Sequence, residues 1–161
     1  MSDTLNQPEV GQKAPPFSLL DQNGKSVSLS DFVNKQTVVV YFYPKAMTPG
    51  CTTQACGIRD TRDVYAASDV TVLALSPDPV ARLKKFEDKH ALNFTLLADE
   101  DHAVADSYGV WGLKKFMGRE YDGIHRMTFI IGKDGLIKHV MKKVKTKSHH
   151  DDVLQWITEN L

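Results

Sequence analysis

The sequence predicts an α/β fold in which a central mixed β-sheet is flanked by helices and preceded by an N-terminal β-hairpin. A continuous β-branched and aromatic run at 37–43 is typical of a central strand that is covered on both faces. Strand-like and helix-like segments alternate after this run. Glycine-containing turns at 21–24 and 132–135 each separate a pair of short strands, as in hairpins.

The first half of the chain is assigned from a turn signal and from apolar runs. Asn23-Gly24 favours a tight hairpin turn between short strands. Pro49 favours the start of a helix, because proline fits the first helical position. The predicted elements are strands at 17–20 and 26–29, a short helical turn at 30–32, the central strand at 37–43 and a helix from about residue 49.

The second half continues with a β-α unit and ends in a hairpin and a helix. Val80, Leu83 and Phe86 recur at helical spacing after Pro79. The predicted elements are strands at 70–76 and 95–98, a helix from Pro79, a short helix at 103–108, a glycine-rich loop at 109–123, hairpin strands at 127–131 and 136–141, and a helix at about 149–160 with Val153, Leu154, Trp156 and Ile157 on one face.

The length and composition predict one soluble domain over residues 1–161. The chain has 161 residues, of which 42% are apolar and 25% charged, which is ordinary for a globular protein with a sizeable core. Twenty basic and twenty acidic side chains cancel, so neither nucleic acid nor a membrane surface is an expected partner. Residues 1–9 lack the basic and apolar stretches of a leader, which favours the cytoplasm.

Both cysteines lie directly after the predicted central strand. Thr48 as N-cap and Pro49 as first helical residue place Cys51 in the first turn of the following helix. Backbone N–H groups there lack helical partners and the helix dipole favours negative charge, so a thiol is biased toward the thiolate. Cys56 follows five residues later. Two cysteines do not make a structural disulfide framework in a chain of this length, and a reducing compartment favours a catalytic or redox-cycling pair.

This stretch resembles the active-site signature of the peroxiredoxins, P-x-x-x-T-x-x-C, at Pro44, Thr48 and Cys51. It is most similar to the bacterioferritin-comigratory subfamily, also called peroxiredoxin Q, whose resolving cysteine often lies five residues after the peroxidatic one. Further segments that occur in the family's order lie at 14–19, 94–99, 108–112 and 123–131. The resemblance implies the thioredoxin-like fold.

The resemblance also implies a role for each matched residue. Cys51 is expected to attack the O–O bond of a peroxide, and Cys56 to resolve the resulting sulfenic acid by forming a disulfide. The Thr48 hydroxyl is expected to donate or relay a hydrogen bond at the reacting atoms. Pro44 and Pro49 are expected to stiffen the loop and shield the thiolate from water.

A buried thiolate needs a cationic partner, for which Arg126, Arg59 and Lys45 are candidates. Arg126 is expected to take this role, since it precedes a predicted strand and matches the family's R-x-T/S-F pattern. A guanidinium stays charged and offers forked donors to both thiolate and peroxide. Arg59 and Lys45 are expected to be ion-paired or solvated. Gln54 stands where many peroxiredoxins have glutamate and is assigned no catalytic role.

The remaining histidines and aromatic residues have plain structural interpretations beside functional ones. The run at 149–152, His-His-Asp-Asp, could suggest a metal site, but four consecutive residues cannot all face one ion on a helix. A solvated helix N-terminus is expected there instead. His125 should point away from the face of Arg126 and pack. Trp111 and Phe116-Met117 are equally compatible with a substrate approach, a partner surface or core packing.

The resemblance implies a cysteine peroxidase that reduces hydrogen peroxide and organic hydroperoxides to water or alcohols. Thioredoxin or a glutaredoxin-like dithiol protein would recycle the disulfide, and no metal, haem, flavin or nicotinamide is needed. Two alternatives stay open, a thiol–disulfide oxidoreductase acting on proteins, although the typical C-x-x-C is absent, and a non-enzymatic redox sensor. Because both cysteines lie in one segment, resolution requires no second subunit, and a monomer is expected.

Overall fold

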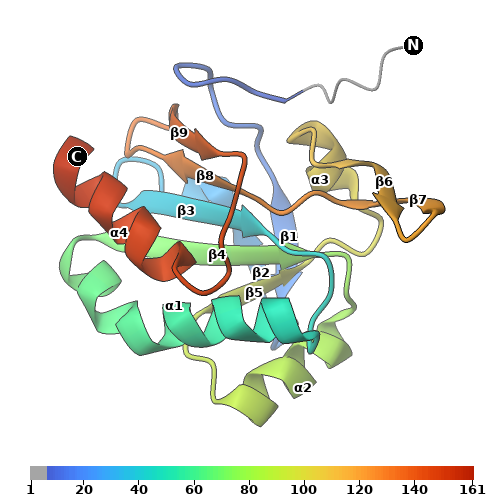
Figure 1. Cartoon of the computed structure of the whole chain (residues 1–161). Helices are drawn as coiled ribbons and strands as arrows, with labels where there is room; N and C mark the ends of the chain where they lie inside the picture. Colours follow the sequence, from blue (N-terminus) through green and yellow to red (C-terminus); the bar gives the residue numbers. More distant parts are fainter. Residues whose placement is uncertain (1–6) are drawn as a thin grey trace.

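The computed structural model of the chain describes residues 7–161 and has one central sheet flanked by helices (Figure 1). In chain order its elements are β1 (Ser18–Asp21), β2 (Ser26–Ser28), the 3-10 turn η1 (Leu29–Asp31), β3 (Thr37–Phe42), α1 (Pro49–Ala67), β4 (Val70–Ser76), α2 (Val80–His90), β5 (Thr95–Ala98), α3 (Ala103–Ser107), β6 (Trp111–Phe116), β7 (Arg119–Ile124), β8 (Met127–Ile131), β9 (Ile137–Met141) and α4 (His149–Asn160). Within this range no helix is long and apolar enough to cross a membrane.

The central sheet has the strand order β2-β1-β5-β4-β3-β8-β9. The inner strand β3 pairs in parallel with β4 and antiparallel with β8, and all six of its residues are buried. Pairing on both edges satisfies the backbone groups of this strand, which is why an uninterrupted apolar run can occupy it. The predicted mixed sheet with an N-terminal hairpin is confirmed, and the order β-α-β, hairpin, terminal helix gives the thioredoxin-like fold.

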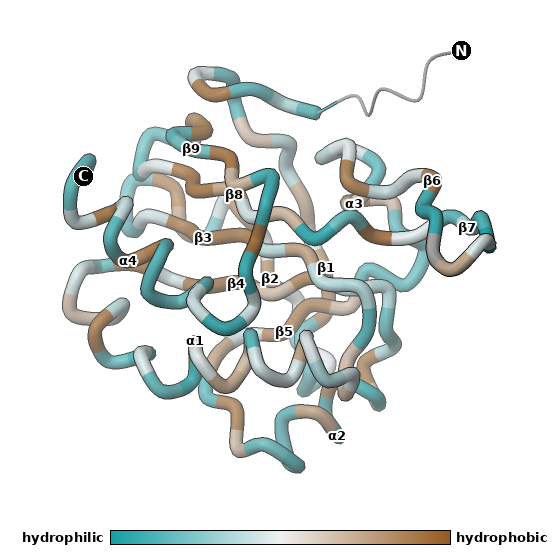
Figure 2. The backbone as a smooth tube through the Cα atoms, in the orientation of Figure 1, coloured by the Kyte–Doolittle hydropathy of each residue, from teal (hydrophilic) through white to brown (hydrophobic). Residues whose placement is uncertain are grey.

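Each face of the sheet has its own hydrophobic core, because side chains alternate along the strands. Val39 and Tyr41 pack with α1, α2 and α4, whereas Val38 and Val40 pack with α3 and the chain before β1. Figure 1 shows α1 and α4 lying across the same side of the sheet, and Figure 2 shows hydrophobic residues concentrated on the central strands. The start of α1 is thereby held against one face of the sheet.

The segment at 109–123, predicted as a glycine-rich loop, is instead the two-stranded hairpin of β6 and β7. Met117 and Gly118 form its turn, with φ of 51° and 79°. Positive φ at both central residues is the turn geometry that matches the twist of paired strands, and Met-Gly is not the usual sequence signal for it.

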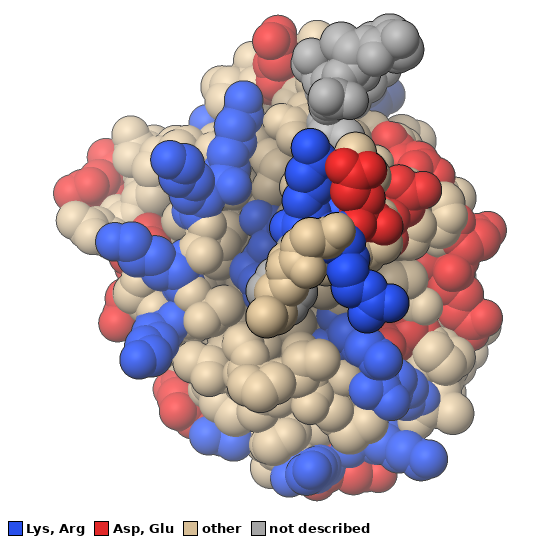
Figure 3. Space-filling model, turned by 45° about the vertical axis from the view of Figure 1, so that its right-hand side comes forward, with Lys and Arg blue, Asp and Glu red and all other residues tan. Residues whose placement is uncertain are grey.

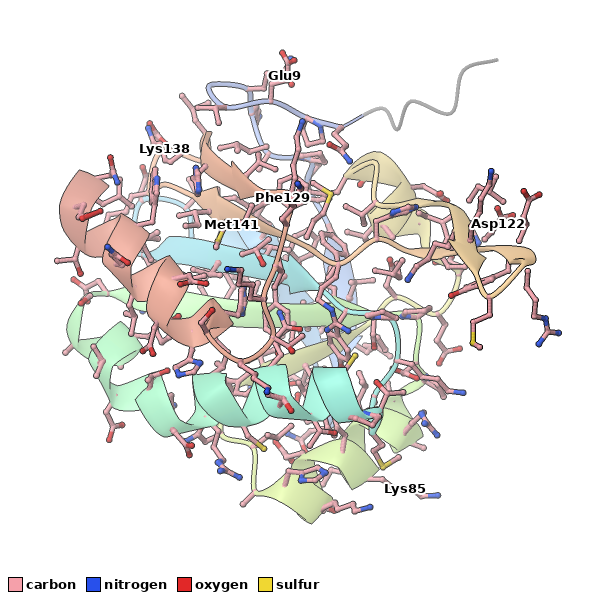
Figure 4. The ribbon with its side chains drawn as sticks, viewed as in Figure 1. Glu9, Lys85, Asp122, Phe129, Lys138 and Met141 are labelled. Carbon is pink, nitrogen blue, oxygen red and sulfur yellow. The ribbon has the colours of Figure 1, made fainter. Side chains whose placement is uncertain are left out.

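This hairpin projects from the body of the protein, and Asp122 marks its outer part (Figures 1 and 4). Met117 is 84% exposed at its tip, while Trp111 stacks on His102 with ring centroids 3.8 Å apart. The side chain of Phe116 lies outside the described residues. Figure 3 turns this side forward and shows basic side chains next to a ridge of uncharged residues, with acidic side chains beside them.

His149, the first residue of α4, is buried, so the prediction of a solvated helix N-terminus is wrong at this residue, whereas Asp151 is exposed. His149 has no exposed surface, and the Tyr41 ring packs edge-on against it at a centroid distance of 5.1 Å. Burial lowers the pKa of His149 to about 4. Asp152 raises this pKa by a smaller amount, and His150 and Arg126 lower it slightly further. The prediction was wrong because it used only the local run of polar residues, whereas the side chains that cover His149 come from β3, β8 and α1.

Helices α1 and α4 approach each other closely at Gly57. A Cβ at this position would overlap Nδ1 of His150 and lie 2.8 Å from its Cε1. The backbone carbonyl of His150 accepts a hydrogen bond of 2.8 Å from the Tyr65 hydroxyl on the same side of α1. Gly57 therefore lies within a helix because its missing side chain makes room for a neighbouring one.

Gly57→Ala is expected to lower the free energy of unfolding by about 1–3 kcal/mol, because the added methyl group collides with the His150 ring. In a His150→Ala background the same change should raise it by about 1 kcal/mol, since alanine favours the helix over glycine. Urea unfolding of the four proteins of this cycle measures both effects. An equal effect of Gly57→Ala in the two backgrounds would contradict the assigned contact.

Acidification is expected to destabilise the fold through His149. Its pKa is about 4 in the folded protein against an ordinary 6.5, so between these values the unfolded chain binds a proton that the folded protein does not. The free energy of unfolding should fall by at most about 3 kcal/mol as pH drops from 6.5 to 4, and this contribution should be constant above 6.5. Denaturant unfolding at a series of pH values should show a weaker fall in His149→Gln, and identical slopes would contradict the assignment.

Candidate active site

Cys51 lies in the first turn of α1, where the local sequence starts the helix. Thr48 is the N-cap residue, with extended φ and ψ of −86° and 156°, and Pro49 follows as the first helical residue. Cys51 is only 2% exposed, whereas Cys56, further along the same helix, is half-buried. The two thiols are not linked. A nearly dry thiol thus lies beside the unpartnered N–H groups of a long helix.

The Arg126 guanidinium contacts two side chains on one face of α1. Its Nη2 lies 3.4 Å from Sγ of Cys51, and its Nη1 donates a hydrogen bond of 2.6 Å to Oε1 of Gln54. Cys51 and Gln54 are three residues apart, a spacing that puts both on one side of a helix. Gly50 lies close to the guanidinium as well, because a Cβ built at this position would be in van der Waals contact with Nη2 at 3.4 Å.

The register of the sheet brings Arg126 to this place. In the pairing of β3 with β8, Phe42 lies opposite Met127. Arg126, which precedes Met127, is therefore next to the point where the chain leaves β3 for the loop that leads to α1. A contact between residues 75 positions apart in the sequence follows from this pairing.

Two side chains from the segment after β4 hydrogen-bond to the backbone of Ala46 and hold the loop between β3 and α1. Asp78 accepts a hydrogen bond of 2.7 Å from the backbone N–H of Ala46, and Arg82 donates one of 2.8 Å to its carbonyl oxygen. Asp78 is 5% exposed and also contacts Arg82 at 3.2 Å and the hydroxyl of Ser76 at 2.7 Å. Next along the loop, Met47 has a φ of 68°, a conformation that side chains rarely adopt and that surrounding contacts have to maintain.

Thr48 and Pro44 lie in this loop, as expected from their positions in the sequence. The Thr48 hydroxyl donates a hydrogen bond of 2.8 Å to the carbonyl oxygen of Lys45 and does not cap the helix with its side chain. Its oxygen keeps acceptor capacity toward the start of α1. Pro44 is half-buried and Pro49 is exposed. The loop therefore places both prolines and the threonine around the helix start. The proton of the Thr48 hydroxyl is already donated to the carbonyl oxygen of Lys45, so this hydroxyl can only accept a further hydrogen bond.

The other two candidate cations do not share the position of Arg126. Arg59 contacts Asp60 at 2.9 Å and donates a hydrogen bond of 2.8 Å to the carbonyl oxygen of His90 on α2. Lys45 is exposed. His125 is half-buried, with Nε2 3.1 Å from the carbonyl oxygen of Leu113.

Two residues near the thiol were not assigned a role from the sequence. Gln54 is fully buried and accepts a hydrogen bond from the Arg126 guanidinium. Its position in the sequence gives no sign of this partner. Lys114 on β6 donates a hydrogen bond of 2.8 Å to the carbonyl oxygen of Ile124. Burial and then Arg126 lower the pKa of Lys114, while Cys51 raises it, so its ammonium faces the same region. A prediction of a hairpin at 109–123 would have placed Lys114 on a strand beside the segment that leads to Arg126.

This arrangement suits the attack of a thiolate on a polar, uncharged substrate. The helix N-terminus and the guanidinium both stabilise negative charge on sulfur, and the same donors can receive an oxygen on which charge develops. Cys51 is shielded from water, which strengthens these interactions. Cys56 lies within the same helix as a second thiol.

Comparison with known proteins agrees with this geometry. Residues 10–140 match the AhpC/TSA family. Peroxiredoxin Bcp of Escherichia coli is 54% identical over 156 residues, which cover 97% of this chain and 99% of that protein. Peroxiredoxin Bcp of Bacillus subtilis is 46% identical over 151 residues, covering 94% and 96%.

Solved structures agree over a similar extent. A mutant of Xylella fastidiosa PrxQ superposes with a TM-score of 0.89 at 28% identity, covering 96% of this chain and 98% of that one. Peroxidoxin BcpB of Mycobacterium tuberculosis superposes with a TM-score of 0.83 at 31% identity, covering 95% and 98%. The bacterioferritin comigratory protein of Xanthomonas campestris, described by its alkyl peroxide reduction activity, gives 0.86 at 27% identity, covering 94% and 98%. With its family match, its relatives and a thiol held at a helix start by an arginine, the chain belongs to the AhpC/TSA family, as a peroxiredoxin of the Bcp type.

Proposed function

We propose that the protein is a thiol peroxidase that reduces hydrogen peroxide and organic hydroperoxides, with Cys51 as nucleophile and Cys56 as resolving thiol. The observation that carries the proposal is the Arg126 guanidinium 3.4 Å from a buried Cys51 sulfur in the first turn of α1. The relatives named above support the substrate class, because one of them is described by its reduction of alkyl peroxides.

The reaction divides into three balanced steps. The Cys51 thiolate attacks one peroxide oxygen, the O–O bond breaks, and with one proton the products are a sulfenic acid and water or an alcohol. The Cys56 thiol then displaces water from the sulfenic acid and forms the Cys51–Cys56 disulfide. An external dithiol protein, thioredoxin or a glutaredoxin-like protein, reduces this disulfide by exchange and is itself oxidised.

Side chains around Cys51 supply the stabilisation that these steps need. Arg126 is proposed to hold the thiolate and then the departing oxygen with its forked donors. The Thr48 oxygen is proposed to accept a hydrogen bond from a bound peroxide, since its own proton is donated to Lys45. Pro44 is proposed to limit access of water. No metal or organic cofactor is proposed, because the Cys51 sulfur itself supplies the two electrons that reduce the peroxide.

The proposal extends to the state of the protein in the cell. A single domain over 1–161, active as a monomer, is proposed because both thiols belong to one helix and resolution needs no partner subunit. A cytoplasmic location is proposed because a reducing compartment keeps such a pair in its dithiol form between turnovers. A thioredoxin-coupled NADPH assay with peroxide, or with a disulfide-bonded protein in its place, tests the activity. A protein disulfide reductase would oxidise NADPH with the disulfide and not with peroxide, and a sensor would turn over with neither.

Cys51→Ser is expected to abolish peroxidase activity, because no other thiol has the helix start and Arg126 beside it. Cys56→Ser should consume about one equivalent of peroxide and stop at the sulfenic acid when thioredoxin is the reductant. Mass spectrometry after one addition of peroxide identifies the oxidised residue in each variant. Sulfenic acid on Cys56 of the Cys51→Ser protein, formed at the wild-type rate, would reverse the two roles.

Arg126→Met is expected to lower the second-order rate constant with peroxide by about 10²–10³-fold, as does the loss of other preorganised donors to a developing anion. Thiolate formation should require a higher pH. Arg126→Lys should recover only part of the rate, because an ammonium cannot make the forked contact with Cys51 and Gln54. Stopped-flow kinetics measures the rate, and Arg59→Met serves as the matched control. An unchanged rate in Arg126→Met would exclude this role.

Disulfide formation is expected to unwind the first turns of α1. Five residues along a helix separate the two Cα atoms by roughly 8–9 Å, beyond the limit of about 7 Å for a disulfide without backbone movement. Hydrogen exchange over residues 50–60 should therefore be faster in the oxidised protein than in the reduced protein. Residues 80–90, on a helix that does not carry the pair, provide the internal control. Equal protection of 50–60 in the two states would show that the pair is bridged without loss of the helix.

A further inference from the structure

The contacts of Arg126 continue into the interior through three buried side chains. Nε2 of Gln54 lies 3.2 Å from Nδ1 of His149, and Nε2 of His149 lies 2.8 Å from Oγ1 of Thr128. None of these three side chains is exposed to solvent. Because Arg126 also bonds Gln54, a continuous chain of hydrogen bonds links β8, α4 and α1 to the guanidinium beside Cys51.

Donor and acceptor chemistry fixes the direction of this chain. A guanidinium only donates, so the Gln54 atom that faces Arg126 is the carbonyl oxygen and its NH₂ group faces His149. Nδ1 of His149 must then accept, which requires a neutral imidazole with its proton on Nε2, donated to Thr128. The lowered pKa of His149, caused first by burial, agrees with a neutral ring.

We propose that His149 is a positioning residue which, through Gln54, aims Arg126 at Cys51 and latches the start of α1 in its folded form. The inference rests on the function proposed above in taking Cys51 as the nucleophile. Without His149, the Gln54 amide could rotate and present NH₂ to the guanidinium, which would place donor against donor. The imidazole acceptor removes that orientation.

The second part of the proposal is that the hydrogen bonds of Gln54 hold the start of α1 in its helical form, which we call the latch. It follows from the place of Gln54 between the two cysteines. The part of α1 that must unwind before Cys56 reaches Cys51 carries Gln54 with it. Unwinding breaks the hydrogen bonds of Gln54 to Arg126 and His149 and leaves His149 buried with an unpaired nitrogen. Each such bond shifts an equilibrium by about three- to tenfold.

Loss of the latch should therefore change two steps in opposite directions. The attack on peroxide slows because Arg126 is less well aimed, whereas disulfide formation quickens because unwinding is easier. A second peroxide competes with resolution, oxidising the sulfenic acid to sulfinic acid while the peroxide is reduced to water or an alcohol. Faster resolution leaves less sulfenic acid for this reaction.

Two substitutions at one position separate the His149 contacts. His149→Asn puts an acceptor near the place of Nδ1 and keeps the partner of Gln54. His149→Gln reaches the place of Nε2 and keeps only the contact with Thr128. The readouts are the pH of thiolate formation by ultraviolet absorbance in a Cys56→Ser background, the peroxide rate constant, the rate of disulfide formation and the sulfinic fraction at high peroxide.

In His149→Gln, thiolate formation should move to higher pH, the peroxide rate should fall by about three- to tenfold, disulfide formation should speed up by a similar factor, and the sulfinic fraction should drop. His149→Asn should lie closer to wild type in all four. His139→Asn is the matched control, since His139 stacks on Trp156 and takes no part in the chain. Equal effects of the Asn and Gln variants, or slower disulfide formation in His149→Gln, would overturn the inference.

Gln54→Met tests the same contacts from the other end if the His149 variants do not fold. It should have at least the effect of His149→Gln, because it removes the bond to Arg126 as well as the bond to His149. Adding His149→Gln to it should change little, because the contact between residues 54 and 149 is already lost. Additive effects would overturn the inference. The thiolate measurement uses no peroxide, so it separates the two proposals: a shift there in a protein that does not react with peroxide would refute the peroxidase function and leave the positioning role standing.

Discussion

The pairing of β8 with β3 is the constraint on which the site depends. It sets the residue before β8 beside the end of β3, where the chain turns into the loop that leads to α1. A slip of one residue would turn Arg126 and Thr128 together to the opposite face of the sheet, away from the cysteines. Because both strands are buried on two faces, such a slip would move each apolar side chain into the opposite core, where the neighbouring side chains are packed around a different one. The hydrophobic core thus enforces the alignment that the chemistry uses.

Helix α1 meets two demands that conflict. Its first turns must be formed for the N–H groups and Arg126 to act on Cys51, and must come apart for Cys56 to reach it. The sequence of these turns contains poor helix formers, Thr52 and Thr53, followed by Gly57, so intrinsic propensity contributes little to holding them. Tertiary contacts have that task instead, and they involve side chains of α4 and β8. The balance between the two forms is therefore set outside the helix itself.

Much of the fold could be predicted because its signals are local. The β-branched run of β3, the Asn23-Gly24 turn and the proline at the start of α1 all act over a few residues, and Cys51 was placed in the first helical turn from them. The partner of that thiol came from a family resemblance, because nothing in the spacing connects Cys51 with Arg126. Gln54 and the buried His149 were missed for the same physical reason: their environments are made by strands and helices distant in sequence. The β6–β7 hairpin was missed because Met117 takes a conformation that its side chain does not signal.

The grip on Ala46 has a consequence for how far Cys51 can travel. The backbone of Ala46 is hydrogen-bonded to Asp78, which lies between β4 and α2, and to Arg82, which lies in α2. Neither hydrogen bond therefore depends on α1 being folded. When the helix start unwinds, the chain up to Met47 keeps its anchor, and Cys51 moves on a tether made of Thr48, Pro49 and Gly50. The four Cα steps from Met47 to Cys51 span at most about 14 Å, and the proline restricts the conformations that the tether can adopt, so Cys51 stays within that distance of its anchor. Cys56 therefore meets a sulfur that remains attached to the anchored loop while the segment between the two cysteines rearranges.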